Sequence, residues 1–156
     1  MGMGEMTPLF KKLNLGSRSS ITVLNAPSSF EAELTALKGI TVVRNIKGKV
    51  GFAIAFVTKQ KELDRVSASL ARTAEGDAVL WIAYPKGTSK KYTCEFNRDA
   101  GWTVLGKAGY EPVRQVAIDE DWSALRFRMV DYIKAMKRNP EGAISKAGKQ
   151  RAQGKR

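Results

Sequence analysis

Residues 78–84 read AVLWIAY, and residues 52–57 read FAIAFV. Neither run shows the alternation of apolar and polar residues that marks a strand with one face in water. A continuous apolar run of this length suits a strand buried on both faces, as in a parallel sheet covered by helices. The two runs therefore predict an α/β fold with the sheet as its middle layer.

Helix and turn signals separate the apolar runs. Thr7 before Pro8 is a typical helix start, and Ser28 with Glu31 has the spacing of a capping box. Glycine or proline follows each helical segment. The pattern predicts helices over residues 7–16, 28–39, 58–76, 97–108 and 129–138, and strands over residues 21–24, 40–43, 52–57, 78–84, 113–118 and 122–128.

The last predicted strand differs from the others. Residues 122–128 read WSALRFR, which alternates apolar and polar side chains, and the acidic turn 119–121 precedes it. This is the pattern of the return strand of an antiparallel hairpin with one wet face. We therefore expect a three-layer, Rossmann-like α/β sandwich whose sheet is mostly parallel and ends in a C-terminal antiparallel hairpin.

Composition limits the chemistry. The 156 residues include 27 Lys and Arg, 15 Asp and Glu, one Cys and no His, for a net charge of +12. A single cysteine forms no internal disulfide, and a chain without histidine has no Cys/His zinc site and no His-based catalytic triad. The length predicts one domain over residues 1–139, followed by a basic, flexible tail over residues 140–156.

No segment has the roughly 20 apolar residues of a membrane span, and the first residues lack the pattern of a signal peptide. The sequence therefore predicts a cytoplasmic protein without a membrane partner. It leaves the oligomeric state open.

The order of elements resembles the class I methyltransferase variety of the Rossmann-like fold over about residues 15–128. A closer resemblance is to a small bacterial family of uncharacterised proteins, a domain of unknown function with a degenerate version of that fold. It is carried by VLNAP at residues 23–27, LWIAYPK at residues 80–86 and IDEDWSALRF at residues 118–127. The resemblance implies a fold and no particular reaction.

Two departures from true methyltransferases affect the expected function. Those proteins have a glycine-rich loop after the first strand, where residues 25–29 here read NAPSS, and an acidic residue at the end of the second, where Arg44 and Asn45 stand. Both features hold the cofactor, so the sequence predicts no bound cofactor. It also offers no catalytic constellation, which argues against an enzyme.

The main functional expectation is a non-catalytic binding domain. Ligands of open α/β sheets bind beyond the carboxyl ends of the strands, and a helix start there favours anions. We expect a small anionic ligand in a crevice formed by Asn25, Pro27, Ser28, Ser29, Thr58, Pro85 and Lys86. The same residues are also ordinary caps and turns, and the acidic turn 119–121 is expected to hold no metal because its carboxylates diverge.

Two alternatives remain open. One is a divergent methyltransferase that uses S-adenosylmethionine (SAM). The other is a protein that binds nucleic acid non-specifically through a basic C-terminal arm, since clustered cations contact phosphates. That arm would consist of Lys134, Lys137, Arg138, Lys146, Lys149, Arg151, Lys155 and Arg156.

Overall fold

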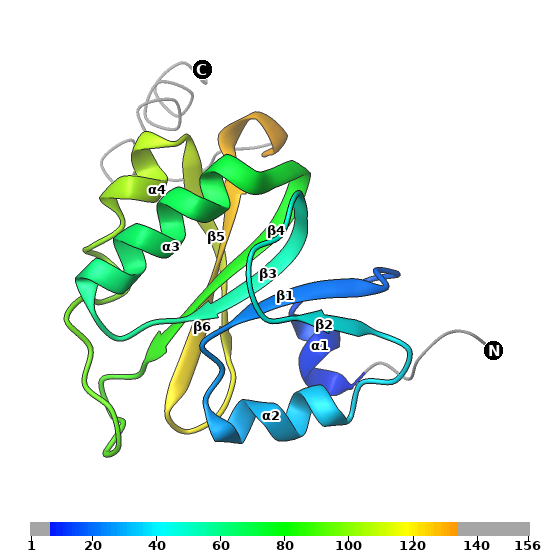
Figure 1. The fold of residues 1–156 in the computed structure, drawn as a ribbon. Helices are drawn as coiled ribbons and strands as arrows, with labels where there is room; N and C mark the ends of the chain where they lie inside the picture. The colour runs from blue at the N-terminus through cyan, green and yellow to red at the C-terminus, as the bar shows by residue number, and fades with distance from the viewer. Residues whose placement is uncertain (1–6, 134–156) are drawn as a thin grey trace.

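The computed structural model describes residues 7–133. Its centre is a six-stranded sheet in the order β2-β1-β3-β4-β6-β5 (Figure 1). β1 to β4 run parallel to one another, whereas β6 lies antiparallel to both β4 and β5. The strands are β1 (Ser20–Leu24), β2 (Thr41–Val43), β3 (Val50–Phe56), β4 (Ala74–Pro85), β5 (Tyr110–Ala117) and β6 (Trp122–Met129).

Helices cover both faces of the sheet (Figure 1). α1 (Pro8–Lys12) and α2 (Ser28–Thr35) lie on one side, and α3 (Gln60–Thr73) and α4 (Thr103–Lys107) lie on the other. This arrangement confirms the predicted three-layer, Rossmann-like sandwich with its C-terminal antiparallel hairpin. None of the helices within residues 7–133 has the length and apolar character needed to cross a lipid bilayer.

The double burial of β3 and β4 creates two cores. Phe52, Ile54 and Phe56 of β3 belong to the core under α1 and α2, and the residues between them belong to the core under α3 and α4. Trp81 of β4 is fully buried, and its indole Nε1 donates to the Leu13 carbonyl at 2.8 Å. This hydrogen bond satisfies a buried polar group and joins the segment after α1 to the central strand.

The structure corrects the predicted helix over residues 97–108. Only Thr103–Lys107 is helical, because residues 97–100 form a tight loop closed by an isolated bridge between Asn97 and Ala100. The Asn97 side chain accepts from the Asp99 amide at 2.8 Å, inside that loop. Asparagine here closes a turn on its own backbone and caps no helix.

The predicted helix over residues 129–138 is also wrong at its start. β6 continues to Met129, and a short 3-10 turn follows at Val130–Tyr132. The rest of that segment, the predicted domain boundary at residue 139 and the tail 140–156 lie outside the described residues.

An ion pair joins the two strands on either side of the parallel-to-antiparallel change. Arg128 of β6 donates to Asp77 of β4 through Nε at 2.9 Å and through an outer nitrogen at 2.6 Å. The two side chains are 31% and 33% exposed. The hydrogen bonds from Arg128 lower the pKa of Asp77 from its usual 3.8.

We expect Asp77→Asn to reduce the free energy of unfolding by about 1 kcal/mol near neutral pH, as is usual for a partly exposed charged pair. Because the folded pKa of Asp77 is lowered, the stabilisation is present above the ordinary aspartate pKa and is lost as pH falls through the folded value. Urea unfolding should therefore show the difference from wild type vanishing well below pH 3.8. Glu75→Gln, an exposed charge change on the same strand, is the control; an equal effect of both substitutions would contradict this account.

Candidate functional site

The chain reverses its direction of travel across the sheet between β1 and β3. After β1 it goes to β2 at the sheet edge, and then returns to β3 on the other side of β1. The carboxyl ends of β1 and β3 lie side by side at this switch point, where open α/β sheets form their ligand crevices. The loop 25–27 and residues 57–59 leave the sheet there.

Asn25 follows β1 directly and has a φ of 57°. This left-handed conformation favours glycine, and asparagine tolerates it better than other residues with a side chain. The absence of glycine from residues 25–29 therefore does not prevent a glycine-type turn at this point. The structure provides the local backbone shape that the sequence pattern had argued against.

The start of α2 differs from the prediction. Ser28 is the first helical residue, Pro27 stands at the N-cap, and no side chain caps the helix. The proposed capping box of Ser28 and Glu31 is therefore wrong, and Glu31 instead pairs with Arg44 at 2.7 Å. Hydrogen bonding from Arg44, which follows β2, lowers the pKa of Glu31.

Ser29 connects α2 to the turn between β5 and β6. Its hydroxyl donates to Asp119 Oδ2 at 3.1 Å, and the other oxygen of Asp119 accepts from the Asp121 and Trp122 amides at 2.8 and 2.9 Å. The acidic turn is therefore organised by its own backbone. Within residues 7–133, no group of three or more His, Cys, Asp or Glu side chains could hold a metal ion.

Thr58 is part of the start of α3. Its amide and hydroxyl both approach Glu62 Oε1, at 3.1 and 3.3 Å, and Lys59 is the N-cap in its place. The hydrogen bond from the Thr58 amide is the main reason that the pKa of Glu62 is lowered. The Thr58 carbonyl accepts from the Glu95 amide at 3.0 Å, which ties the loop after β4 to the end of β3.

A cavity of about 780 Å³ lies beyond the end of β4. Its walls are Tyr84 and Pro85 of β4, most of the loop 86–98, Gln115 of β5 and Ser123 of β6. Of the seven residues predicted for the crevice, Pro85 and Lys86 line this cavity. The other five, which do not line it, are Asn25, Pro27, Ser28, Ser29 and Thr58. The expected single crevice is thus divided between the switch point and the neighbouring cavity.

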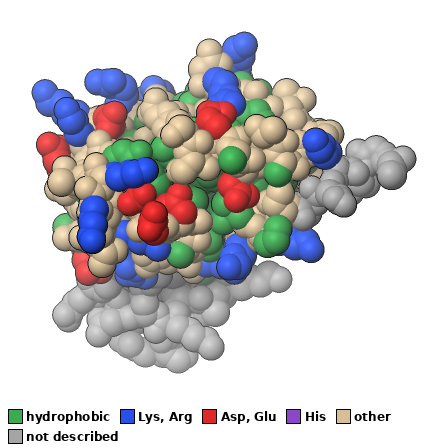
Figure 2. Space-filling view, turned by 90° about the horizontal axis from the view of Figure 1, so that it is seen from below, with side chains coloured by type: hydrophobic (Ala, Val, Ile, Leu, Met, Phe, Trp, Pro, Cys, Tyr) green, Lys and Arg blue, Asp and Glu red, His purple; other side chains and the backbone are tan. Residues whose placement is uncertain are grey.

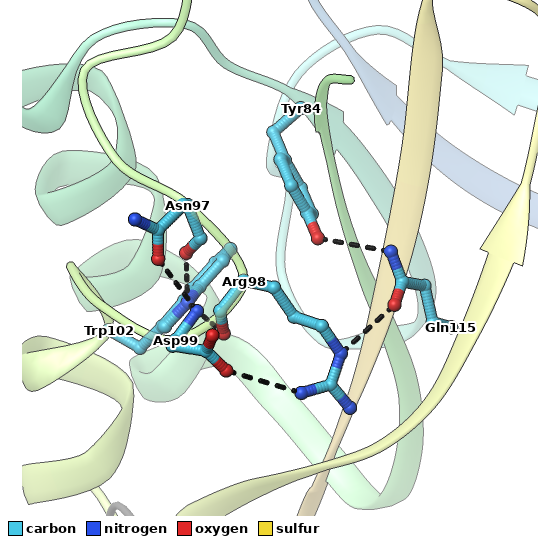
Figure 3. Close-up of polar contacts among 6 residues, drawn as sticks. All are labelled: Tyr84, Asn97, Arg98, Asp99, Trp102 and Gln115. Carbon is cyan, nitrogen blue, oxygen red and sulfur yellow. Dashed lines mark hydrogen bonds and ion pairs between the residues drawn. The ribbon is translucent and has the colours of Figure 1, made fainter. Parts of the chain in front are cut away.

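A chain of polar contacts lines the cavity (Figure 3). Gln115 donates to the Tyr84 hydroxyl at 3.3 Å, and its carbonyl oxygen accepts from Arg98 Nε at 2.9 Å. Burial raises the pKa of Tyr84, so this phenol remains protonated at neutral pH. The cavity therefore offers hydroxyl, amide and guanidinium groups beside aromatic walls.

The loop 86–92 folds back on the acidic turn. The Ser89 hydroxyl donates to Asp121 Oδ1 at 2.8 Å, and the Lys86 amide donates to the Asp121 carbonyl at 2.8 Å. Cys94 lies further along the chain, and burial raises the pKa of its thiol. It is therefore a protonated cysteine without the low pKa of a nucleophile.

Trp122 separates the switch point from the cavity. Its ring contacts Phe56 at the end of β3, with centroids 5.1 Å apart, and Tyr92 of the cavity wall, with centroids 4.9 Å apart. The indole Nε1 is buried and has no hydrogen-bond partner among the described residues. A buried donor without an acceptor costs about 1–3 kcal/mol, and an acceptor atom of a ligand would remove that cost.

Seen from the side on which α2 and the β5–β6 turn lie, the surface shows Asp and Glu side chains gathered near its centre with Lys and Arg around them (Figure 2). This part of the molecule is not uniformly basic, despite the net charge of +12. The charge pattern gives no preference for an anion over a zwitterionic ligand at this edge.

Comparison with known proteins adds information about the fold. No protein-family model matches the chain, and no curated protein matches it. Among solved structures, it is similar to magnesium protoporphyrin IX methyltransferase from Synechocystis PCC 6803 with bound S-adenosylhomocysteine (SAH), at 14% identity and a TM-score of 0.48. The match covers 78% of this chain and 68% of that one.

Two structures of LepI are also similar, one with SAM and one of a cysteine-to-alanine variant with SAH and a substrate analogue. Each is 13% identical, with TM-scores of 0.45 and 0.44 respectively, and each match covers 77% of this chain and 38% of LepI. The sheet order of this chain, with the antiparallel β6 between β4 and β5, is that of a methyltransferase-like Rossmann fold. The predicted membership of an uncharacterised bacterial family has no matching family model.

These comparisons overturn the main functional expectation. The prediction of a non-catalytic domain for a small anion is wrong, because the similar solved structures hold SAM or SAH. The proposed nucleic-acid arm begins at Lys134 and lies outside the described residues.

Gly101 supports one cavity wall. It has a φ of 108°, and a Cβ atom there would lie 2.6 Å from the Phe96 Cβ and 2.9 Å from Gln60 Oε1. Its carbonyl accepts from the Gln60 side chain at 2.8 Å. We expect Gly101→Ala to cost about 2–4 kcal/mol in unfolding free energy, from crowding and backbone strain.

Gly51→Ala is the matched control, because a Cβ there meets nothing within 4 Å. Denaturant unfolding should leave this variant within about 0.5 kcal/mol of wild type. Equal stability of the two variants would mean that the loop 96–101 is not packed as described.

Proposed function

We propose that the protein is a divergent SAM-dependent methyltransferase. SAM would bind at the switch point between β1 and β3, and the methyl acceptor would occupy the cavity beyond β4. The observation that carries the proposal is the adjacency of the two places, separated by Trp122, whose buried Nε1 has no partner among the described residues.

The residues at the switch point fit such a cofactor. Asn25 supplies the left-handed turn that brings backbone close to a ligand after β1. The Trp122 indole offers a donor to a ligand's nitrogen or oxygen. Beside the end of β2, Arg44 holds the carboxylate of Glu31, which comes from α2 instead of the strand end.

When bound, SAM supplies an electrophilic methyl group on a sulfonium sulfur. The chain's own contribution is binding, orientation and exclusion of water. The aromatic faces of Tyr92 and Trp122 would favour a cationic centre between the two sites. Tyr84, Gln115 and Arg98 would orient the acceptor through hydrogen bonds.

The raised pKa values of Tyr84 and Cys94 bear on the kind of acceptor. Both groups keep their protons at neutral pH, so they act as donors there and not as general bases. This arrangement favours an acceptor atom that is nucleophilic without help from these two residues, or one whose proton passes to water.

Calorimetric titration of the full chain with SAH tests the proposal. We expect binding by wild type, affinity within about threefold of wild type for Asn25→Gly, and a loss of at least about tenfold for Asn25→Val, because a β-branched residue resists a φ of 57°.

Asn14→Val is the matched control. Asn14 has a φ of 62° in the turn after α1, so it carries the same kind of strain away from the switch point. The substitution should lower the thermal midpoint and leave SAH affinity unchanged. Absence of SAH and SAM binding by folded wild-type protein would refute the proposed function.

A further inference from the structure

A group of arginines lies on the α1 side of the sheet, toward the carboxyl end of β6. Arg126 and Arg128 alternate along β6 with Phe127, which packs under α3 and α4, so both arginines lie on the α1 side. Arg114 of β5 is the cross-strand partner of Arg126, and Arg18 follows α1. We call Arg18, Arg114, Arg126 and Arg128 the arginine cluster.

The arginine cluster and the acceptor cavity lie on different faces of the sheet, because Tyr84 of the cavity packs in the core under α3 and α4 and the arginines lie on the α1 side. Asp77, which Arg128 binds, lies near the start of β4, and Tyr84 of the cavity lies near its end. Residue 77 is roughly 23 Å from residue 84 along the strand at the usual rise per residue, whereas Trp81, the cross-strand partner of Arg126, is roughly 10 Å from it. A ligand on the arginine cluster would therefore lie on the other side of the sheet from the Tyr84 wall of the cavity.

Positive charge exceeds negative charge in this group. Asp77 pairs with Arg128, and the buried Glu111 is the cross-strand partner of Arg128. Against these two carboxylates stand four guanidinium groups, a formal excess of two positive charges. Arg18 uses an outer nitrogen to donate to the Leu15 and Asn14 carbonyls, at 3.1 and 3.4 Å.

Arg126 is the least satisfied member. Its Nε is buried and has no hydrogen-bond partner among the described residues. Burial lowers the pKa of Arg126, and the neighbouring charge of Arg128 adds to this effect. Arginine nonetheless stays charged at neutral pH, so the fold contains a partly desolvated cation with a donor that lacks an acceptor.

We propose that the arginine cluster is a binding site for a phosphoryl oxyanion, with Arg126 as its central donor. Guanidinium groups match phosphate oxygens in geometry and charge, and several of them around one anion form charge-assisted hydrogen bonds. A phosphate would supply the acceptor that Arg126 Nε lacks and offset the excess charge. The phosphate belongs either to a small phosphorylated compound or to the backbone of a nucleic acid.

The full chain is titrated with sodium pyrophosphate by calorimetry and with a short fluorescent single-stranded RNA by anisotropy, both at low ionic strength. We expect Arg126→Gln to weaken binding of the recognised probe by about tenfold or more, the usual effect of losing a charged hydrogen bond. Arg65→Gln, an exposed charge change on α3 across the sheet, should change it less than twofold. The basic residues after 133 are the same in every variant.

Arg114→Gln keeps the test decisive if Arg126→Gln fails to fold, because Arg114 is exposed and its loss should still weaken binding severalfold. If the cluster substitutions weaken pyrophosphate binding, the ligand is a small phosphorylated compound. If they weaken only RNA binding, the ligand is a nucleic-acid backbone. Failure of both probes, or equal losses for Arg65→Gln and the cluster variants, overturns the proposal. SAH affinity should be unchanged in all of them, so this outcome is independent of the proposed methyltransferase function.

Discussion

β3 and β4 have no face turned to water, and the rest of the structure depends on that constraint. Every side chain of β3 after Gly51 is buried, and β4 is buried from Ala78 to its end. A sheet with such central strands needs a helical layer on each side. Short helices meet this need on the α1 and α2 side, where Phe10 and Phe30 fill the space, and the long helix α3 meets it with the short helix α4 on the other.

The same constraint determines where polar chemistry can occur. The middle of the sheet is apolar on both sides, so exposed polar groups gather at the two edges where strands end. At the carboxyl edge, backbone conformation and loop packing create the crevice and the cavity. Toward the opposite ends of the parallel strands, the antiparallel strand β6 carries Arg126 and Arg128 on its α1 side, where Arg128 pairs with Asp77.

The sequence pattern predicted the layers, strand positions and hairpin because these follow from burial. Burial gives the apolar residues a periodic spacing along the chain. The loop 86–101 lacks such a period. Its shape depends on Trp102, whose indole donates to the carbonyls of Asn97 and Arg98 at 2.9 and 3.0 Å, a contact over five and four residues that no periodic spacing indicates (Figure 3). Strand order predicts Pro85 and Lys86 at the site, whereas the residue pattern places Gln115 and Trp122 only in strands or in the core.

The junction between α3 and β4 has no loop at all, since Thr73 ends the helix and Ala74 begins the strand. The helix is therefore held to the central strand at one end, and through Gln60 to the loop at Gly101 at the other. Insertions and deletions are therefore tolerated better in some segments around the cavity than in others. The exposed stretch at Gly87 and Thr88 can accept inserted residues, and relatives of this protein could gain a new lid there without disturbing the helix that supports the opposite wall.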